Sequence, residues 1–200
     1  MKRTEKKRKD IIDAAVKEFT LHGFEGARTS RIAKNAEVSS RTLFNHFPTK
    51  DAMFEEIIEI IVAKTGEISA EPFDPELPLR GQLIAALETY IEAITDEGYL
   101  GLNRMTMSEF LRDPDLSRRV FARAEMSNNP VRDIIAEAIN AGKLKQVDPF
   151  YATDMITSGP KAVFFWPKFL VGADQWPGSE TVIEDSVDMF LFRFGSNSET

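Results

Sequence analysis

The sequence predicts an all-α protein, and three observations support that fold class. Apolar residues recur at spacings of three and four along most of the chain, which is the period of an amphipathic helix. Gly and Pro residues interrupt these stretches where helices need short connections. No convincing alternation of apolar and polar residues predicts a β-sheet. With 200 residues, of which 42% are hydrophobic, the chain can form one or two domains with a substantial core.

The first expected helix has an apolar stripe between Ile11 and Phe19. Gly23 is expected to end this helix, because glycine adopts the left-handed conformation of a helix C-terminus at low cost. Gly26 then allows the turn into a second helix that begins at Thr29.

Two short helices around a tight turn are expected between residues 29 and 50. Apolar residues bracket the turn at helical spacing, namely Ile32, Ala33 and Ala36 before it, Leu43, Phe44 and Phe47 after it, and Val38 between them. Thr29 and Ser39 each lie where a side-chain oxygen can cap the helix that follows. The connection from Asn35 to Val38 is only four residues long, so we expect the second helix to be held rigidly against the first.

The second of these helices, from Ser40 to His46, presents hydrogen-bonding side chains when its apolar stripe faces inward. These side chains are Ser40, Arg41, Thr42, Asn45 and His46. Arg41 could donate to O6 and N7 of guanine, and Asn45 could pair with N6 and N7 of adenine. The pattern favours a helix that reads a DNA groove, although a plain solvated helix face also carries polar residues.

Charge is distributed unevenly along the chain. Residues 1–50 contain twelve Lys and Arg against six Asp and Glu, whereas residues 51–200 contain 13 against 26, within a net charge of −7. A basic end on an acidic protein suits contact with a polyanion. The opening MKRTEKKRKD holds six of the basic residues and could form an arm along the DNA backbone or in the minor groove. A solvated helix start with a disordered terminus is the alternative.

Residues 8–60 resemble the helix-turn-helix region of the tetracycline-repressor (TetR) family of bacterial transcriptional regulators. The resemblance includes IIDAAVKEF, the glycines of HGFEG, TSRIAKNAEVS and RTLFNHFPTK, and beyond residue 60 it concerns layout only. It implies phosphate contacts from Thr29, His46 and Lys50, and base or backbone contacts in the groove from Ser30, Ser40, Arg41, Thr42 and Asn45. The expected DNA-binding set as a whole is Arg28, Thr29, Ser30, Ser39, Ser40, Arg41, Thr42, Asn45, His46 and Lys50.

Two positions depart from the family pattern. Phe44 replaces a common tyrosine, so a hydroxyl for a phosphate is lost and we expect Phe44 to serve packing alone. Glu37 stands where the family usually has glycine in the turn, and a left-handed conformation there would cost about 1 kcal/mol.

A fourth helix is expected from Lys50, with an apolar stripe between Phe54 and Ile61 and an end near Gly66. The proline-bearing segment EPFDPELPLRG marks the best boundary after it. Later helical patterns span residues 82–95, 100–112, 116–141, 149–171 and 179–194. We therefore expect a three-helix, helix-turn-helix DNA-binding head over residues 1–50, followed by a larger helical body for effector binding and dimerisation over residues 51–200.

The last two expected helices are apolar on more of their perimeter than one buried face uses. The TetR resemblance implies that they form a four-helix interface in a homodimer, and a two-fold dimer would place two recognition helices about one DNA turn apart. Burial within one subunit is the alternative. The expected interface residues are Phe164, Phe169, Val187, Phe190, Leu191 and Phe194.

The body also contains methionine and aromatic residues that could line a small-molecule pocket, with Glu109 as a polar anchor. The same residue types at helical spacing are common in plain hydrophobic cores. The candidate ligand-binding residues are Tyr90, Met105, Glu109, Phe110, Phe121, Met126, Met155, Phe165 and Trp166.

Together these features predict a cytoplasmic, ligand-responsive regulator. We expect a dimeric repressor that leaves a palindromic operator when a small apolar or amphipathic effector tilts the fourth helix. A sequence-neutral DNA architectural protein is the first rival. A helical enzyme with a DNA-binding head is the second, but both histidines, His22 and His46, lie in the head. Cysteine is absent, and neither a phosphate-binding motif nor an apolar run of membrane-spanning length occurs, so we expect no cofactor, no metal and no membrane partner.

Overall fold

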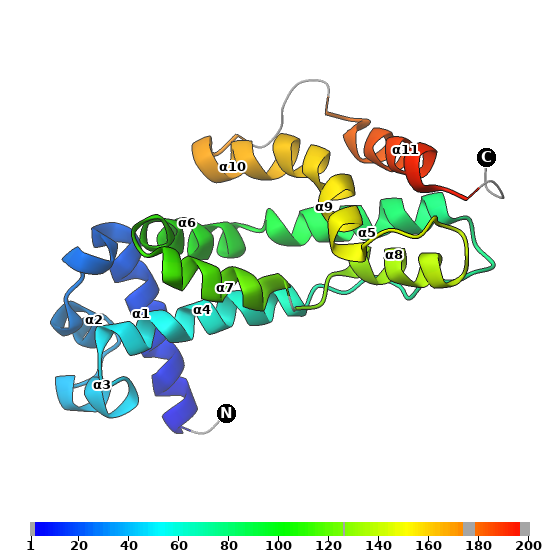
Figure 1. Cartoon of the computed structure of the whole chain (residues 1–200). Coiled ribbons are helices and arrows are strands. Elements are labelled where there is room, and N and C mark those ends of the chain that lie inside the picture. Colours follow the sequence, from blue (N-terminus) through cyan, green and yellow to red (C-terminus); the bar gives the residue numbers. More distant parts are fainter. Residues whose placement is uncertain (1–2, 126, 174–178, 197–200) are drawn as a thin grey trace. The chain divides into compact units, whose positions relative to one another are not determined.

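The computed structural model describes residues 3–125, 127–173 and 179–196 (Figure 1). In these ranges all regular secondary structure is helical, apart from an isolated bridge between Leu144 and Gly195. The expected all-α fold class is confirmed. None of the helices found in the described ranges has both the length and the apolar character needed to cross a bilayer.

The helices are α1 (Arg3–Gly26), α2 (Thr29–Asn35), α3 (Ser40–His46), α4 (Lys50–Gly66), α5 (Leu79–Ile94), α6 (Glu97–Arg112), α7 (Pro114–Glu125), α8 (Pro130–Asn140), α9 (Pro149–Pro160), the π-helical turn η1 (Lys161–Phe165), α10 (Trp166–Val171) and α11 (Val182–Phe194). They form two compact units. The first unit contains α1 to α3, α4 as far as Lys64, α6 from Gly98 onward, and α7. The second unit contains α5, α8, α9, η1, α10 and α11.

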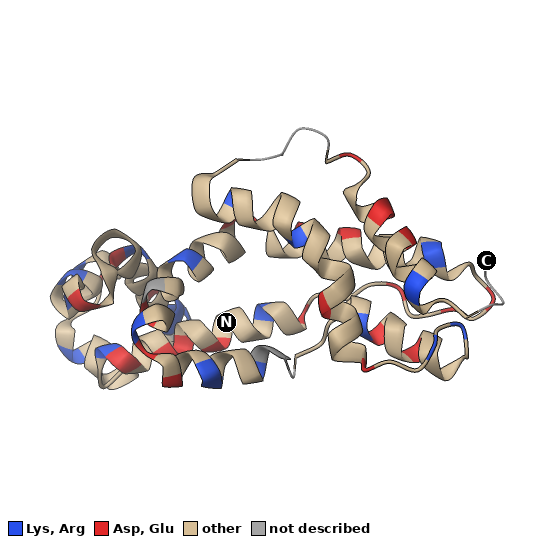
Figure 2. Ribbon diagram, turned by 45° about the horizontal axis from the view of Figure 1, so that its top comes forward, with Lys and Arg blue, Asp and Glu red and all other residues tan. Residues whose placement is uncertain are grey.

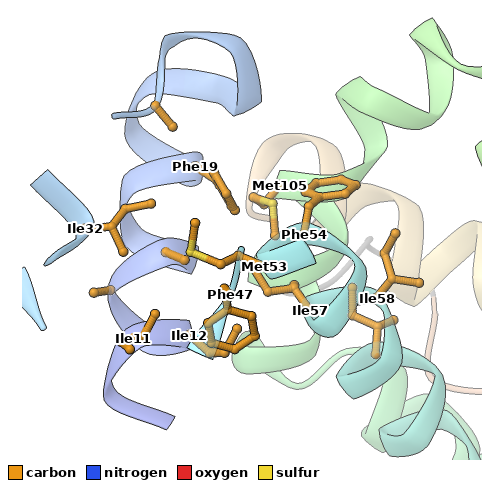
Figure 3. Close-up of a cluster of buried hydrophobic side chains, with 14 of the residues drawn as sticks. Ile11, Ile12, Phe19, Ile32, Phe47, Met53, Phe54, Ile57, Ile58 and Met105 are labelled. Carbon is orange, nitrogen blue, oxygen red and sulfur yellow. The ribbon is translucent and has the colours of Figure 1, made fainter. Parts of the chain in front are cut away.

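The first unit is built around one hydrophobic cluster. Figure 3 shows side chains of α1, α2 and α4 gathered in this cluster, including Phe19, Ile32 and Met53. The ring of Phe54 lies 6.0 Å from that of Phe19 and 5.0 Å from that of Phe24, measured between centroids. Because α4 contributes its stripe to this core, the packing unit extends beyond residue 50. The division of function at residue 50 stays a prediction.

The apolar period correctly indicated the helices of the first unit, and Gly23 has the expected positive φ. Its backbone angles, φ 68° and ψ 169°, interrupt the helix, which resumes briefly and ends at Gly26. The expected stripe of α4 is buried as well, because Phe54, Ile57 and Ile61 all lie in the core.

The single helical pattern expected over residues 116–141 is wrong, because two separate helices occupy this stretch. α7 ends at Glu125 and α8 begins at Pro130. Proline lacks an amide hydrogen and therefore suits the first position of a helix. The side chain of Asn129 caps α8 by accepting hydrogen bonds from the amides of Val131 (3.0 Å) and Arg132 (3.3 Å). The proline and the Asn129 cap therefore mark the start of a new helix and not a continuation of α7.

In the second unit, α5 packs against α8 and α11, and α9 packs against the same two helices (Figure 1). The expected helix over residues 149–171 is present as α9, η1 and α10 in succession. The chain after α11 is attached to the connection between α8 and α9, because the amide of Lys145 donates to the carbonyl of Phe194 at 2.8 Å. The amide of Ser196 similarly donates to the carbonyl of Lys143 at 3.0 Å.

Candidate nucleic-acid interface

The turn between α2 and α3 is tight and locked by backbone hydrogen bonds. The amide of Glu37 donates to the carbonyl of Lys34 (3.1 Å), and that of Val38 donates to the carbonyl of Ala33 (2.9 Å). Glu37 has φ +54°, so the expected left-handed conformation is confirmed at a non-glycine residue. Such a residue costs about 1 kcal/mol relative to glycine. The turn therefore carries local strain in exchange for a fixed angle between the two helices.

The start of α3 is capped as the sequence predicts. Ser39 Oγ accepts a hydrogen bond from the amide of Thr42 at 3.1 Å and also lies 2.8 Å from Thr42 Oγ1. The hydroxyl groups of Ser39 and Thr42 therefore already hydrogen-bond to each other. A contact of either hydroxyl with DNA would use its remaining donor or acceptor capacity.

The start of α2 is held differently, and the expectation that Thr29 caps it is wrong. The N-cap residue is Arg28, whose own side chain makes no capping bond. Its amide instead donates to Glu18 Oε1 at 3.0 Å, and the same oxygen accepts from Arg31 Nε at 2.7 Å. A carboxylate from α1 has therefore taken over the capping role.

Glu18 is a functional residue that the sequence reasoning missed. Its side chain is only 2% exposed. Burial opposes its ionisation, but the hydrogen bonds from the Arg31 guanidinium and the Arg28 amide outweigh that effect, and the pKa of Glu18 lies below its ordinary value. The only signal in the sequence was a glutamate on the inward side of the first helix, next to Phe19.

The outward face of α3 consists of Ser40, Arg41, Phe44 and Asn45, which are all exposed. Phe44 is 45% exposed, so the expectation that it serves packing alone is wrong. The reason is geometric. With Leu43 turned fully into the core, the next residue points about 100° away and falls beside Ser40 and Arg41. The outward face of α3 is therefore polar and includes one aromatic side chain.

Lys50, expected to contact phosphate, has its ammonium bound within the protein. Nζ donates to the carbonyl oxygen of Phe24 at 2.5 Å and lies 4.3 Å from the centroid of the Phe24 ring. These contacts join the start of α4 to the end of α1. A phosphate contact would use the remaining ammonium hydrogens, since the amide of Ala52 in the first turn of α4 already donates to Thr49 Oγ1 at 3.0 Å, and it stays a prediction.

The other expected DNA-binding residues lie at the start of α2 and the end of α3. Arg28 and Ser30 are exposed, whereas Thr29 and His46 are half-buried. Lys and Arg residues recur along α1 and α2, and α3 adds Arg41, whereas the first turns of α11 carry Glu184, Asp185 and Asp188 (Figure 2).

The expected ligand-binding residues are divided between the two units. In the first unit Met105, Glu109 and Phe110 are buried, while Phe121 is exposed with its ring 5.9 Å from that of Phe110. Met126 lies outside the described residues. These placements suit core packing and leave the pocket assignment a prediction.

The members in the second unit vary in burial. Tyr90 is buried, and burial together with the charge of Asp154 raises the pKa of Tyr90 to about 12. Met155 and Trp166 are exposed, and Phe165 is half-buried with its ring centroid 5.3 Å from that of Phe169.

The residues expected at the dimer interface are largely enclosed within their own subunit. Buried members are Phe169, Val187, Phe190 and Phe194, and half-buried members are Phe164 and Leu191. The exposed apolar side chains are their neighbours Leu170 and Val171 on α10 and Met189 and Phe192 on α11. Surplus apolar surface is thus present on both helices, carried by different residues from those expected.

Two family profiles match the chain. The profile of bacterial regulatory proteins of the tetR family matches residues 11–57, and that of the C-terminal domain of AefR-like transcriptional repressors matches residues 81–196. This protein belongs to the TetR family. The first match contains α2, the turn and α3, which are therefore the helix-turn-helix of a DNA-binding transcriptional regulator. The membership also confirms that the chain is a regulator rather than an enzyme.

Individual relatives agree with the TetR assignment. The crystal structure of a TetR family transcriptional regulator from Pseudomonas syringae pv. tomato is 30% identical, with a TM-score of 0.74 over 94% of this chain and 96% of that one. The regulator RutR of Escherichia coli is 29% identical over 75% of this chain and 70% of its own length. An uncharacterised regulator of Bacillus subtilis, YhgD, is 24% identical over 81% of this chain and 85% of its own.

Proposed function

We propose that this TetR-family protein is a cytoplasmic repressor that binds a palindromic operator as a homodimer and is released by a small apolar or amphipathic effector. The observation that carries the proposal is the outward face of α3, with Arg41, Phe44 and Asn45 exposed on a helix whose other side is locked into the core. The match to the C-terminal domain of AefR-like repressors supports the direction of regulation.

Base reading is assigned to Arg41 and Asn45. A guanidinium pairs with O6 and N7 of guanine, and a side-chain amide pairs with N6 and N7 of adenine, both in the major groove. Ser40 is exposed at the start of the same helix and suits a phosphate or a base edge. Backbone contacts from Thr29, His46 and Lys50 would then fix the register of the head on the duplex.

The homodimer is proposed to form through α10 and α11. Leu170 and Val171 on α10, and Met189 and Phe192 on α11, are exposed apolar side chains that a second copy would cover. A two-fold interface sets two copies of α3 at a fixed separation, which a palindromic operator matches. The enclosed residues Phe169 and Phe190 would support this surface from below.

The effector is proposed to act through α4. This helix shares the hydrophobic core of α1, α2 and α3, so a tilt of α4 would move the recognition helix with it. An effector that binds the helical body more tightly in the tilted conformation lowers the affinity for DNA by that difference in binding free energy. Glu109, buried beside Phe110 on α6, is the polar anchor that we propose for an amphipathic ligand.

The function is tested by selecting operator sequences from randomised double-stranded DNA with the purified full chain. We expect a palindrome whose half-sites are centred about one helical turn, or a multiple of it, apart. Enrichment of no common sequence, with steep salt dependence, would identify sequence-neutral binding instead.

Arg41→Ala then tests the assigned face on the selected operator. We expect a loss of about 1–3 kcal/mol per contact and a relaxed preference at one position of each half-site. Arg119→Ala removes an exposed arginine from α7 and is the matched control for charge. Equal affinities of the Arg41 and Arg119 variants would refute the recognition face.

A further inference from the structure

Arg8, a basic residue of the N-terminal segment, binds other residues of the protein. Its side chain on α1 forms a two-pronged ion pair with Glu56 on α4, with Nε 3.2 Å from Oε1 and Nη2 2.7 Å from Oε2. The two side chains are 41% and 31% exposed, so the pair is partly shielded from water. Paired hydrogen bonds of this kind fix orientation as well as distance.

The same guanidinium reaches the end of the recognition helix. Nη1 of Arg8 donates to the carbonyl oxygen of His46 at 3.4 Å, and the guanidinium carbon lies 4.3 Å from the centroid of the Phe47 ring. His46 is the last residue of α3, where carbonyl groups lack partners within the helix. Phe47 follows it and is fully enclosed in the core. A single cation thus touches α3 and joins α1 to α4.

We propose that Arg8 is a positioning residue for the recognition helix rather than a contact to DNA phosphate. In this role Arg8 and Glu56 form a latch that holds the C-terminal end of α3 against α1 and α4. The inference rests on the proposed reading of DNA by α3. The positive charge of the N-terminal segment predicts a contact with DNA, and it does not predict that Arg8 positions α3.

The length of α3 explains why such a latch matters. The helix has seven residues, about two turns, and Leu43 is its fully buried side chain, so the contacts at its two ends contribute much to its direction. Ser39 and the turn hold the first end. The burial of Phe47 and the Arg8 hydrogen bond to the His46 carbonyl hold the second end.

The latch also links α3 to the helix through which the effector is proposed to act. Glu56 lies on α4 only six residues after Lys50, close to the head. A tilt of α4 would displace the carboxylate that orients Arg8, and the end of α3 would lose its polar anchor. The proposed switch therefore has a specific side-chain connection to the recognition helix in addition to shared core packing.

Glu56→Gln separates positioning from simple electrostatics, because the two predict opposite signs. Removing an acidic charge from the head makes it more basic, so electrostatics alone predicts tighter DNA binding. Loss of the latch predicts weaker binding to the selected operator, by about fivefold for a partly exposed two-pronged pair. Tighter operator binding by Glu56→Gln would overturn the proposal.

Arg8→Gln and Lys9→Gln form a matched pair for the second test. Both remove one positive charge from the same turn of α1, but Lys9 is exposed and lies outside the latch. For a side chain that contacts phosphate, the slope of log affinity against log salt falls by about one. We expect Arg8→Gln to keep the wild-type slope while losing about fivefold in operator affinity at every salt concentration.

The double variant Arg8→Gln/Glu56→Gln should bind about as weakly as either single variant, because both changes remove one interaction. Additive losses, or a slope lowered by about one in Arg8→Gln, would overturn the latch.

Hydrogen exchange of the free protein provides a readout that needs no DNA. The amide of Phe47 donates to the carbonyl of Leu43 in the last turn of α3. We expect faster exchange at this turn in Arg8→Gln than in Lys9→Gln, with unchanged exchange in the middle of α1. Equal exchange in both variants would refute the latch even in a folded, stable protein. If wild-type protein selected no operator while this exchange difference remained, the proposed function would fail and the latch would stand.

Discussion

The recognition helix and the last two helices differ in where their apolar residues lie. α3 buries Leu43 and Phe47 and leaves an outward face on which hydrogen-bonding groups predominate. α10 and α11 leave Leu170, Met189 and Phe192 in solvent, and Phe192 is 88% exposed. The first kind of face suits a hydrated polyanion, whereas the second kind suits another apolar surface. The outward face of α3 and the exposed faces of α10 and α11 therefore suit partners of opposite character.

The largest expected effect comes from placing a charge on the apolar face of α11. Phe192→Glu would bury a carboxylate without a partner in each half of the proposed interface. We expect the dimer dissociation constant to rise by about a hundredfold or more, which corresponds to roughly 3 kcal/mol. Sedimentation velocity over a concentration series measures this change, and operator affinity should fall with it.

Leu111→Glu is the matched control, because Leu111 is an apolar side chain on α6 that is 80% exposed, close to the 88% of Phe192. It should leave the association state unchanged. A dimer of wild-type strength in Phe192→Glu would place the interface on another face and remove the contrast between the two regions.

Glu18→Gln tests how much the buried carboxylate at the start of α2 contributes to the free energy of unfolding. The variant weakens two charge-assisted hydrogen bonds of a buried carboxylate, to the Arg31 guanidinium and the Arg28 amide. We expect a loss of about 2 kcal/mol in the free energy of unfolding at neutral pH, measured by urea denaturation. Glu25→Gln, an exposed glutamate on the same helix, is the control and should cost little.

The loss should depend on pH with a defined sign. The pKa of Glu18 in the folded protein lies below its ordinary value of 4.5, so the unfolded chain binds more protons between the two values. The contribution of Glu18 is therefore fully present above about pH 5 and disappears as pH falls through the folded pKa. Wild type and Glu18→Gln should converge in stability in acid. A constant difference down to low pH would show that the ionised carboxylate is not the stabilising form.

Features that depend on neighbouring residues were predictable from the sequence. The cap at Ser39 and the stripe of α4 follow from residue types at fixed short spacings. The left-handed conformation of Glu37 was implied by the TetR resemblance, in which glycine usually occupies that position. The contacts of Glu18 with Arg28 and of Arg8 with Glu56 were not predictable, because they join residues 10 and 48 positions apart. A helical period says which side of a helix is buried, but it does not say which distant side chain meets it.

The apolar helices show a second limit of sequence reasoning. When most of a helix perimeter is apolar, as on α11, the period does not distinguish the side that faces its own subunit from the side left outside. The sequence predicted Phe190 and Phe194 at the interface, and the structure buries both while exposing Met189 and Phe192. The same ambiguity applied to Phe44, whose neighbour Leu43 took the inward position.

Glu37→Gly should change stability by a smaller amount and in the opposite direction. Glycine adopts φ +54° without the steric conflict of a side chain, so we expect a gain of about 1 kcal/mol in the free energy of unfolding. Lys34→Gly, in the last turn of α2, should instead lose about 0.5–1 kcal/mol, because its helical conformation favours other residues. Both are measured by urea denaturation. A destabilised Glu37→Gly would mean that the glutamate side chain contributes more than its strain costs.

The smallest expected effect concerns the one apolar side chain on the polar face. Phe44 lies exposed beside Ser40 and Arg41, so in the major groove it would meet the C5-methyl group of a thymine. Replacing that thymine with deoxyuridine removes only the methyl group and should weaken wild-type binding about fourfold, the value of roughly 0.8 kcal/mol for one buried methyl.

Phe44→Ala should bind the thymine and uracil operators equally, and deoxyuridine outside the half-sites should have no effect on either protein. Persistent discrimination by Phe44→Ala would assign the methyl contact to another residue. Loss of discrimination in this variant would show that the polar face of α3 uses one apolar contact, whereas the proposed dimer interface on α10 and α11 consists of several exposed apolar side chains.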